Sequence, residues 1–197
     1  MPRFVSPLGK LVYGSLVQPK TNDYGQTRWS AGLRLPEKES QEIALNIEKA
    51  LADKRAKDPR FPATNDKLSI GMKVARDKQE DGTFVDCPGE LVFTFQRKFE
   101  ITSKAGEKMR NSPPRLYDAT GSMVEGLQEV GWGSMGKVIY DVYPWATPTM
   151  AGVQLQLIGF QIAELAESRS QLTPIEGGWV AEGGSNTEDI ASILQSA

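Results

Sequence analysis

The sequence contains no histidine and a single cysteine, Cys87. Histidine is the commonest general base and metal ligand, so its absence removes the Ser-His and Cys-His nucleophile pairs of many hydrolases. A lone cysteine can form neither an intramolecular disulfide nor a structural zinc site, and it is typical of a reducing compartment. We therefore expect a protein that is not an enzyme and that holds no metal and no cofactor.

Long apolar segments are also missing. No run approaches the roughly 18 apolar residues that a membrane span needs, and the first residues, Met1 to Pro7, contain no apolar stretch of signal-peptide length. The sequence therefore predicts no membrane contact and a cytoplasmic location.

Positive charge is scarce in the C-terminal part of the chain. Residues 116–197 hold 2 Lys and Arg against 10 Asp and Glu, whereas residues 1–115 hold 21 against 15, and the net charge of −2 hides this asymmetry. Such a split favours a basic surface for a polyanion and an acidic end that can compete with it. Charges that merely cluster on solvated helices and loops are the alternative, and charge alone does not decide.

Alternating apolar residues, bounded by Gly and Pro, predict a mainly β fold with one or two helices. The expected strands are 8–18, 26–35, 90–101, 137–143 and 153–162, with a helix over 36–57 and a candidate short one over 186–195. Residues 58–89 are expected to be irregular apart from one short strand over 67–75. In the last hairpin, Val138, Tyr140 and Val142 share one face, which we assign to the core with Trp29.

A polar face accompanies these strands. Gln26, Arg28 and Arg34 alternate with apolar residues, and Gln96 and Lys98 are expected to extend that face on a neighbouring strand. A basic, polar and small surface suits a phosphate backbone that lies flat across a sheet. The alternative is an ordinary solvated strand face. Residues 102–115 form a basic, Pro-stiffened loop that could clamp over a groove.

Five strands with an early helix fit a small OB-type barrel. Arg110-Asn111-Ser112-Pro113-Pro114-Arg115-Leu116-Tyr117-Asp118-Ala119-Thr120-Gly121 resembles a segment of phage single-stranded-DNA-binding proteins in which Pro precedes a hydrophobic-Asp-x-x-Gly turn. The stretch Gly131 to Val138, followed by Gly152 to Leu157 and Phe160 to Ile162, resembles the closing hairpin of that family. The likeness covers residues 8–165 in layout and is specific over about 110–163.

The resemblance implies a five-stranded OB-fold-like barrel with inserted loops over 1–165 and a flexible acidic tail over 166–197. It also implies sequence-independent binding of single-stranded DNA during phage replication, recombination or repair, in the host cytoplasm. Bases would stack on exposed aromatics while Lys and Arg follow the phosphates. The candidate DNA-binding residues are Tyr24, Arg28, Arg34, Lys98, Lys104, Lys108, Arg110, Arg115, Tyr117, Trp132, Lys137, Tyr143 and Trp145.

The acidic tail is expected to contact replication or recombination proteins and to compete for the DNA groove. Its candidate contacts are Glu188, Asp189, Ile190, Ile193 and Leu194. The resemblance leads us to expect a terminal aromatic after dense acids, whereas the sequence ends Leu194-Gln195-Ser196-Ala197. Whether copies form oligomers stays open.

Two other functions compete with DNA binding. A phage structural protein, such as a head decoration or tail component, would share the β-rich core without needing the charge asymmetry. A carboxylate-dependent nuclease would need three or more acids around a magnesium ion, for which Asp118 and Asp141 are the first candidates.

Overall fold

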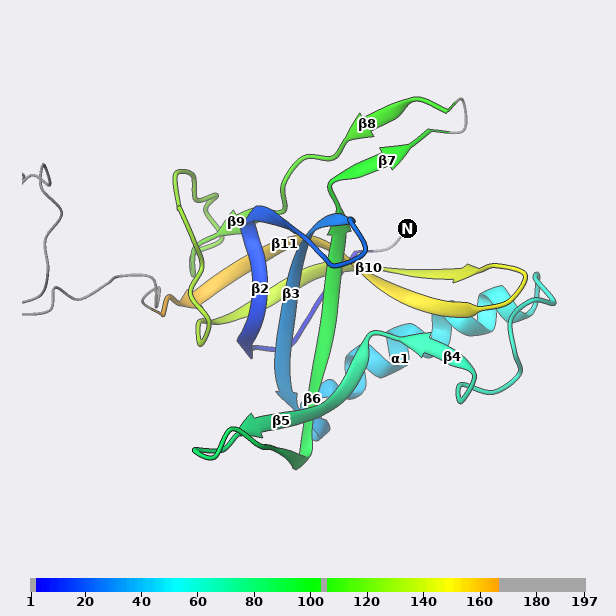
Figure 1. Ribbon diagram of the computed structural model, residues 1–197, viewed down its shortest axis with the longest axis horizontal. Helices are drawn as coiled ribbons and strands as arrows, with labels where there is room; N and C mark the ends of the chain where they lie inside the picture. The colour runs from blue at the N-terminus through cyan, green and yellow to red at the C-terminus, as the bar shows by residue number, and fades with distance from the viewer. Residues whose placement is uncertain (1–2, 104–105, 167–197) are drawn as a thin grey trace, which may run out of the picture.

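The computed structural model describes residues 3–103 and 106–166. Strands dominate these residues, and one long helix interrupts them (Figure 1). The elements are β1 (Phe4–Val5), β2 (Gly9–Thr21), β3 (Thr27–Pro36), α1 (Glu37–Arg55), β4 (Leu68–Ile70), β5 (Met72–Lys78), β6 (Phe84–Lys98), β7 (Glu100–Thr102), β8 (Lys108–Arg110), β9 (Arg115–Tyr117), β10 (Met135–Ala146) and β11 (Ala151–Glu164).

Five long strands form a ring in the order β10-β2-β3-β6-β11, and the ring closes because β10 also pairs with β11. Two junctions are short. The parallel β6–β11 pairing and the antiparallel β10–β2 pairing span two residue pairs each. The ring is therefore OB-like but not a clean barrel, and the expected mainly β, five-stranded OB-like architecture is confirmed at that level.

The core lies inside this ring and follows the alternation of each strand. Leu33, Phe95 and Leu155 are fully buried, as are many of their neighbours on the same faces. Each such side chain contributes about 1.5–3 kcal/mol relative to an exposed one. Trp29 and Tyr140, which the sequence assigned to the core, are 3% and 0% exposed.

Helix α1 covers one end of the ring and confirms the helix expected after Pro36. Ile43, Ile47 and Leu51 are buried along its inner side, and it contacts β10, β6 and β3. The Asn46 amide donates a hydrogen bond of 3.1 Å to the hydroxyl of the buried Tyr140. Within the residues that the structure describes, no helix is long and apolar enough to cross a membrane.

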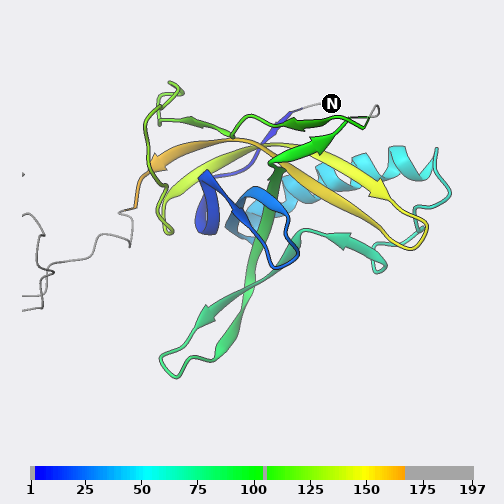
Figure 2. The same ribbon diagram turned by 45° about the horizontal axis from the view of Figure 1, so that its top comes forward.

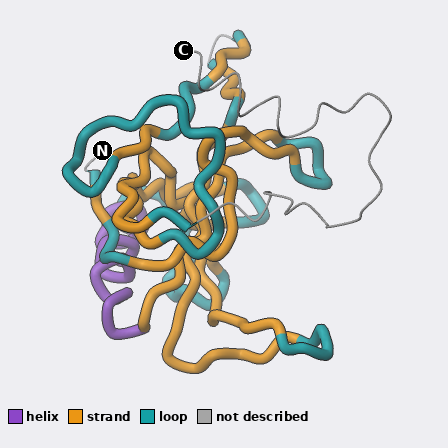
Figure 3. The backbone as a smooth tube through the Cα atoms, turned by 90° about the vertical axis from the view of Figure 1, so that its left-hand side faces the viewer, coloured by secondary structure: helices purple, strands orange, loops and turns teal. Residues whose placement is uncertain are grey.

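Residues 58–89 differ from the expected irregular segment. Strand β6 begins at Phe84 rather than near Glu90, and it pairs with β5 to form an arm that extends away from the ring (Figure 2). The short strand expected over 67–75 is present as β4 and the start of β5, but only Ala75 is buried in β5, so alternation could not reveal how far this strand extends. The basic loop 102–115 likewise contains structure, since β7 and β8 pair as a small ribbon at the opposite end of the molecule from the arm (Figure 3).

Candidate nucleic-acid interface

Three neighbouring hollows follow the outer face of β3 and β6 and share Gln26 and Arg28. The largest has a volume of about 660 Å³. We call this continuous surface the β3–β6 groove. The side chains that define it are Lys20, Asn22, Gln26, Arg28, Gln96, Lys98, Phe99, Trp132, Tyr143, Trp145 and Gln154. In chain order, β3 and β6 are the second and third strands of the ring, which form the ligand-binding face of OB-folds.

Strand pairing assembles the basic centre of the groove. Arg28 lies opposite Lys98, and Ser30 lies opposite Gln96, so these side chains share one face. The Arg28 guanidinium donates from Nη1 to Gln96 Oε1, while its Nε is buried without a hydrogen-bond partner. A buried donor without a partner is costly, so a shift of the Arg28 side chain that brought Nε to a ligand oxygen would be favourable.

Exposed aromatic side chains flank this centre. Trp132 is 49% exposed and Tyr143 is 44% exposed, so both present ring surface to the groove. Trp145 is half-buried against Gly152, where an added Cβ would lie 2.8 Å from the indole Cζ2. Glycine at this position is therefore needed to seat the indole.

The turn between β2 and β3 borders the groove and carries Tyr24, which is 89% exposed. Asn22 Oδ1 accepts hydrogen bonds from the backbone amides of Tyr24 at 3.1 Å and Gln26 at 2.9 Å. This side chain holds the turn in one shape, so the Tyr24 ring projects into solvent from a defined support.

Tyr13 divides the polar face that the sequence predicted as continuous. Its ring lies against Gly32, at a distance that leaves no room for a Cβ there, and its hydroxyl bonds to Thr94 Oγ1 at 2.5 Å. Burial raises the pKa of this phenol. Lys73 places its ammonium 5.2 Å from the ring centroid, within the range of a cation–π contact. Sequence reasoning missed Tyr13, although Gly32 in a strand was the available sign of a close approach.

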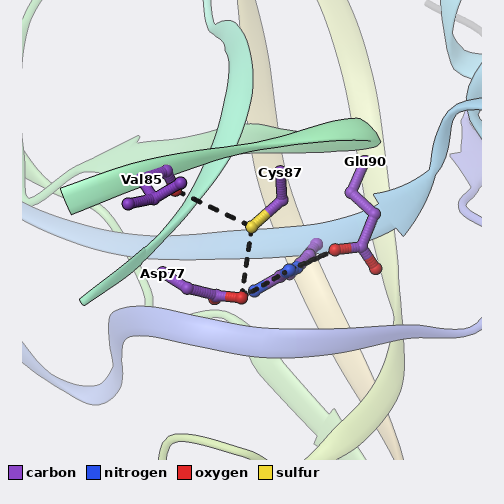
Figure 4. Close-up of polar contacts among 5 residues, drawn as sticks. Asp77, Val85, Cys87 and Glu90 are labelled. Carbon is purple, nitrogen blue, oxygen red and sulfur yellow. Dashed lines mark hydrogen bonds and ion pairs between the residues drawn. The ribbon is translucent and has the colours of Figure 1, made fainter. Parts of the chain in front are cut away.

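Arg34 lies beyond Tyr13, at the base of the arm, and not in the groove. Its guanidinium forms ion pairs with Asp77 and Glu90, which belong to the two strands of the arm (Figure 4). The two carboxylates raise the pKa of Arg34, and the pKa of Asp77 is lowered in return. The Cys87 thiol donates to Asp77 Oδ2 at 3.1 Å, and that carboxylate raises the pKa of the thiol.

The remaining predicted residues fall into separate places. Lys108 and Arg110 lie on the β7–β8 ribbon, and the Arg110 guanidinium carbon lies 5.4 Å from the ring centroid of Phe99, which lines the groove. Arg115 and Tyr117 lie on β9. Tyr117 and Lys137, which lies on β10, both pair with Gln161 of β11. Lys104 and the tail positions Glu188, Asp189, Ile190, Ile193 and Leu194 lie outside the described residues.

Carboxylates do not gather for metal binding in the part of the chain that the structure describes, where no group of three or more metal-ligating side chains occurs. Asp118 instead stabilises the turn in which it lies, because its Oδ1 accepts hydrogen bonds from the backbone amides of Thr120 and Ser122, both at 2.9 Å.

A comparison with protein families identifies the family to which this sequence is similar. The family model for the single-stranded DNA-binding protein of bacteriophage T7 matches residues 11–165. The chain belongs to this family. No curated protein matches the chain at a significant level.

Solved structures of phage proteins share the fold. The crystal structure of gp2.5, a single-stranded DNA-binding protein of bacteriophage T7, is similar with a TM-score of 0.60 and 22% identity, covering 89% of this chain and 98% of that one. The single-stranded DNA-binding protein of bacteriophage Enc34 in complex with single-stranded DNA has a TM-score of 0.60 and 13% identity, covering 85% and 89%. The resemblance to phage single-stranded-DNA-binding proteins is therefore confirmed.

Proposed function

We propose that the β3–β6 groove binds single-stranded DNA without sequence preference. The observation that carries this proposal is the basic centre of Arg28 and Lys98, flanked by the exposed rings of Trp132 and Tyr143. Family membership supports the same ligand, and so does the single-stranded DNA bound in the similar Enc34 complex.

The groove performs this function by two kinds of contact. Arg28 and Lys98 neutralise phosphates, and the hydrogen bond from Arg28 to Gln96 fixes the position of the guanidinium. Trp132, Tyr143 and Tyr24 provide stacking surfaces, each worth about 1–3 kcal/mol per base. Every base has an aromatic face, so stacking favours single strands over a duplex without reading the sequence.

We extend the proposal to the cellular role on the strength of the family match. The protein protects single-stranded DNA during phage replication, recombination or repair in the host cytoplasm, and it acts without catalysing a reaction. The acidic residues 166–197 compete with DNA for the groove and contact replication proteins, which the charge asymmetry of the sequence supports.

The test is a comparison of two variants that remove the same charge. Arg28→Met with Lys98→Met removes two cations from the groove, whereas Lys49→Met with Lys54→Met removes two from the exposed side of α1. Fluorescence anisotropy with labelled oligo-dT should show affinity at least about tenfold weaker for the groove variant than for the helix variant. Equal affinities would place the DNA elsewhere on the protein.

A further inference from the structure

Two projections at opposite ends of the molecule take no part in the β3–β6 centre of the groove. The β5–β6 arm points away from one end, and the β7–β8 ribbon rises from the other (Figures 1 and 2). Each carries large apolar side chains in solvent, which on a protein surface mark an interaction site when they are held together.

The tip of the arm presents Phe84 and Val85, which are 64% and 51% exposed. The arm is held to the ring because Arg34 bonds to both of its strands, with Nε 2.8 Å from Glu90 Oε2 and a second ion pair to Asp77, which lies opposite Val85. The apolar tip is therefore displayed on an anchored support.

The ribbon presents a second apolar pair. Ile101 and Met109 lie directly opposite each other in the β7–β8 pairing, and they are 42% and 52% exposed. An isolated two-stranded ribbon is only marginally stable in water, so a partner that covers this pair would stabilise the ribbon.

The charges around the two apolar pairs are opposite. Residues 78–86 contain three acids, Glu80, Asp81 and Asp86, against one cation, Lys78, which lies opposite Phe84. Residues 97–103 and 106–115, which contain the ribbon, hold five cations against two acids, Glu100 and Glu107, and Glu100 lies 3.9 Å from Arg110. Asp86 is engaged by Arg76 at 2.6 Å, so Glu80 and Asp81 give the tip its outward negative charge. This net negative charge disfavours a phosphate backbone as the ligand of the tip.

We propose that the arm tip of one copy binds the β7–β8 ribbon of the next copy. The apolar pairs would cover each other, and Glu80 and Asp81 would face Lys108 and Arg110. A contact between two different surfaces of one chain is heterologous and can repeat without closing. Because the surfaces lie at opposite ends, copies add head to tail, and this matches a linear DNA lattice. The proposal rests on DNA binding in the groove and makes binding to long strands cooperative.

The experiment compares Phe84→Asp and Met109→Asp with Leu45→Asp, an exposed apolar position on α1 that serves as the control. Affinity is measured for an oligo-dT that binds one copy of the protein and for a longer one that binds four. Native mass spectrometry is used to choose the two lengths, because it counts the copies bound to each strand. The wild type should bind the long strand at least tenfold more tightly per copy. The two test variants should lose that gain yet bind the short strand within twofold of wild type.

An equimolar mixture of the two test variants provides a sharper check. The Met109→Asp chain keeps its tip and the Phe84→Asp chain keeps its ribbon, so one junction can form between them but no array. The mixture should regain cooperative binding on a strand that holds two copies, and on a strand that holds four it should regain only part of the wild-type gain, because two isolated junctions can form there instead of a continuous array of three. Wild-type protein without cooperativity, or test variants that keep it, would overturn the proposal. Failure of the wild type to bind the short strand would instead overturn DNA binding itself, and the array with it.

Discussion

Arg28 and Lys98 lie directly opposite each other on the outer face of β3 and β6, and Gln96 occupies the next outward position along β6. The sequence placed these three side chains on one polar surface from alternation alone. The structure adds that Arg28 is hydrogen-bonded to Gln96 and that its Nε has no partner. The centre of the groove is therefore basic and partly rigid.

The salt dependence of DNA binding should report these two cations individually. For a single strand, each phosphate contact contributes about 0.7 to the slope of log K against log salt. Arg28→Met and Lys98→Met should each reduce the slope by about that amount. Lys49→Met on α1 is the matched control, and a slope that falls equally in the control would count against a phosphate contact in the groove.

Stacking predicts a different kind of loss. Trp132→Ala and Tyr143→Ala should each weaken binding to oligo-dT by about 5- to 150-fold, with the salt slope unchanged, because a stacking surface is removed and no charge is lost. Isothermal titration calorimetry at two salt concentrations measures both quantities. Leu45→Ala, which trims an exposed apolar residue on α1, should bind like wild type. A loss shared by that control would indicate a general effect on folding.

The sequence predicted the parts of the fold that have a buried and an exposed face. Strands β3, β10 and β11 and helix α1 carry regular apolar periodicity, and each appears close to its expected range. The arm and the ribbon have little buried surface, so the sequence predicted only the start of β5 and neither the full arm nor the ribbon. Alternation also predicted the face of the strand on which Arg34 lies. It could not predict the carboxylate partners of Arg34, because Asp77 and Glu90 lie 43 and 56 positions away in the sequence.

The contact between Tyr13 and Gly32 should be sensitive to a single methyl group. Gly32→Ala would place a Cβ within the space of the Tyr13 ring, and overpacking of this kind typically costs about 1–3 kcal/mol of unfolding free energy. In a Tyr13→Ala background the same substitution should cost much less, because the ring is gone. Urea unfolding of the four proteins in this cycle measures the coupling. Equal costs in both backgrounds would contradict the contact.

The thiol of Cys87 reports on the base of the arm. Asp77 raises the pKa of this thiol, so less thiolate is present at a given pH and alkylation by iodoacetamide should be slow. Asp77→Asn removes the carboxylate, and the alkylation profile should then move to lower pH, with a rate at pH 8 that is roughly severalfold higher. Asp86→Asn, on the same arm but bonded to Arg76, is the control. A profile unmoved by Asp77→Asn would show that the two side chains do not meet in solution.

Intrinsic tryptophan emission tests the central claim most directly, because Trp132 and Trp145 line the groove while Trp29 is buried. The protein is titrated with oligo-dT and with a duplex of equal length, at low and high salt. We expect strong quenching by the single strand, less by the duplex, and weakening of both by salt. The Arg28→Met, Trp132→Ala double variant should lose most of the response. Unchanged emission at low salt, or equal quenching of wild type and double variant, would contradict DNA binding in the β3–β6 groove.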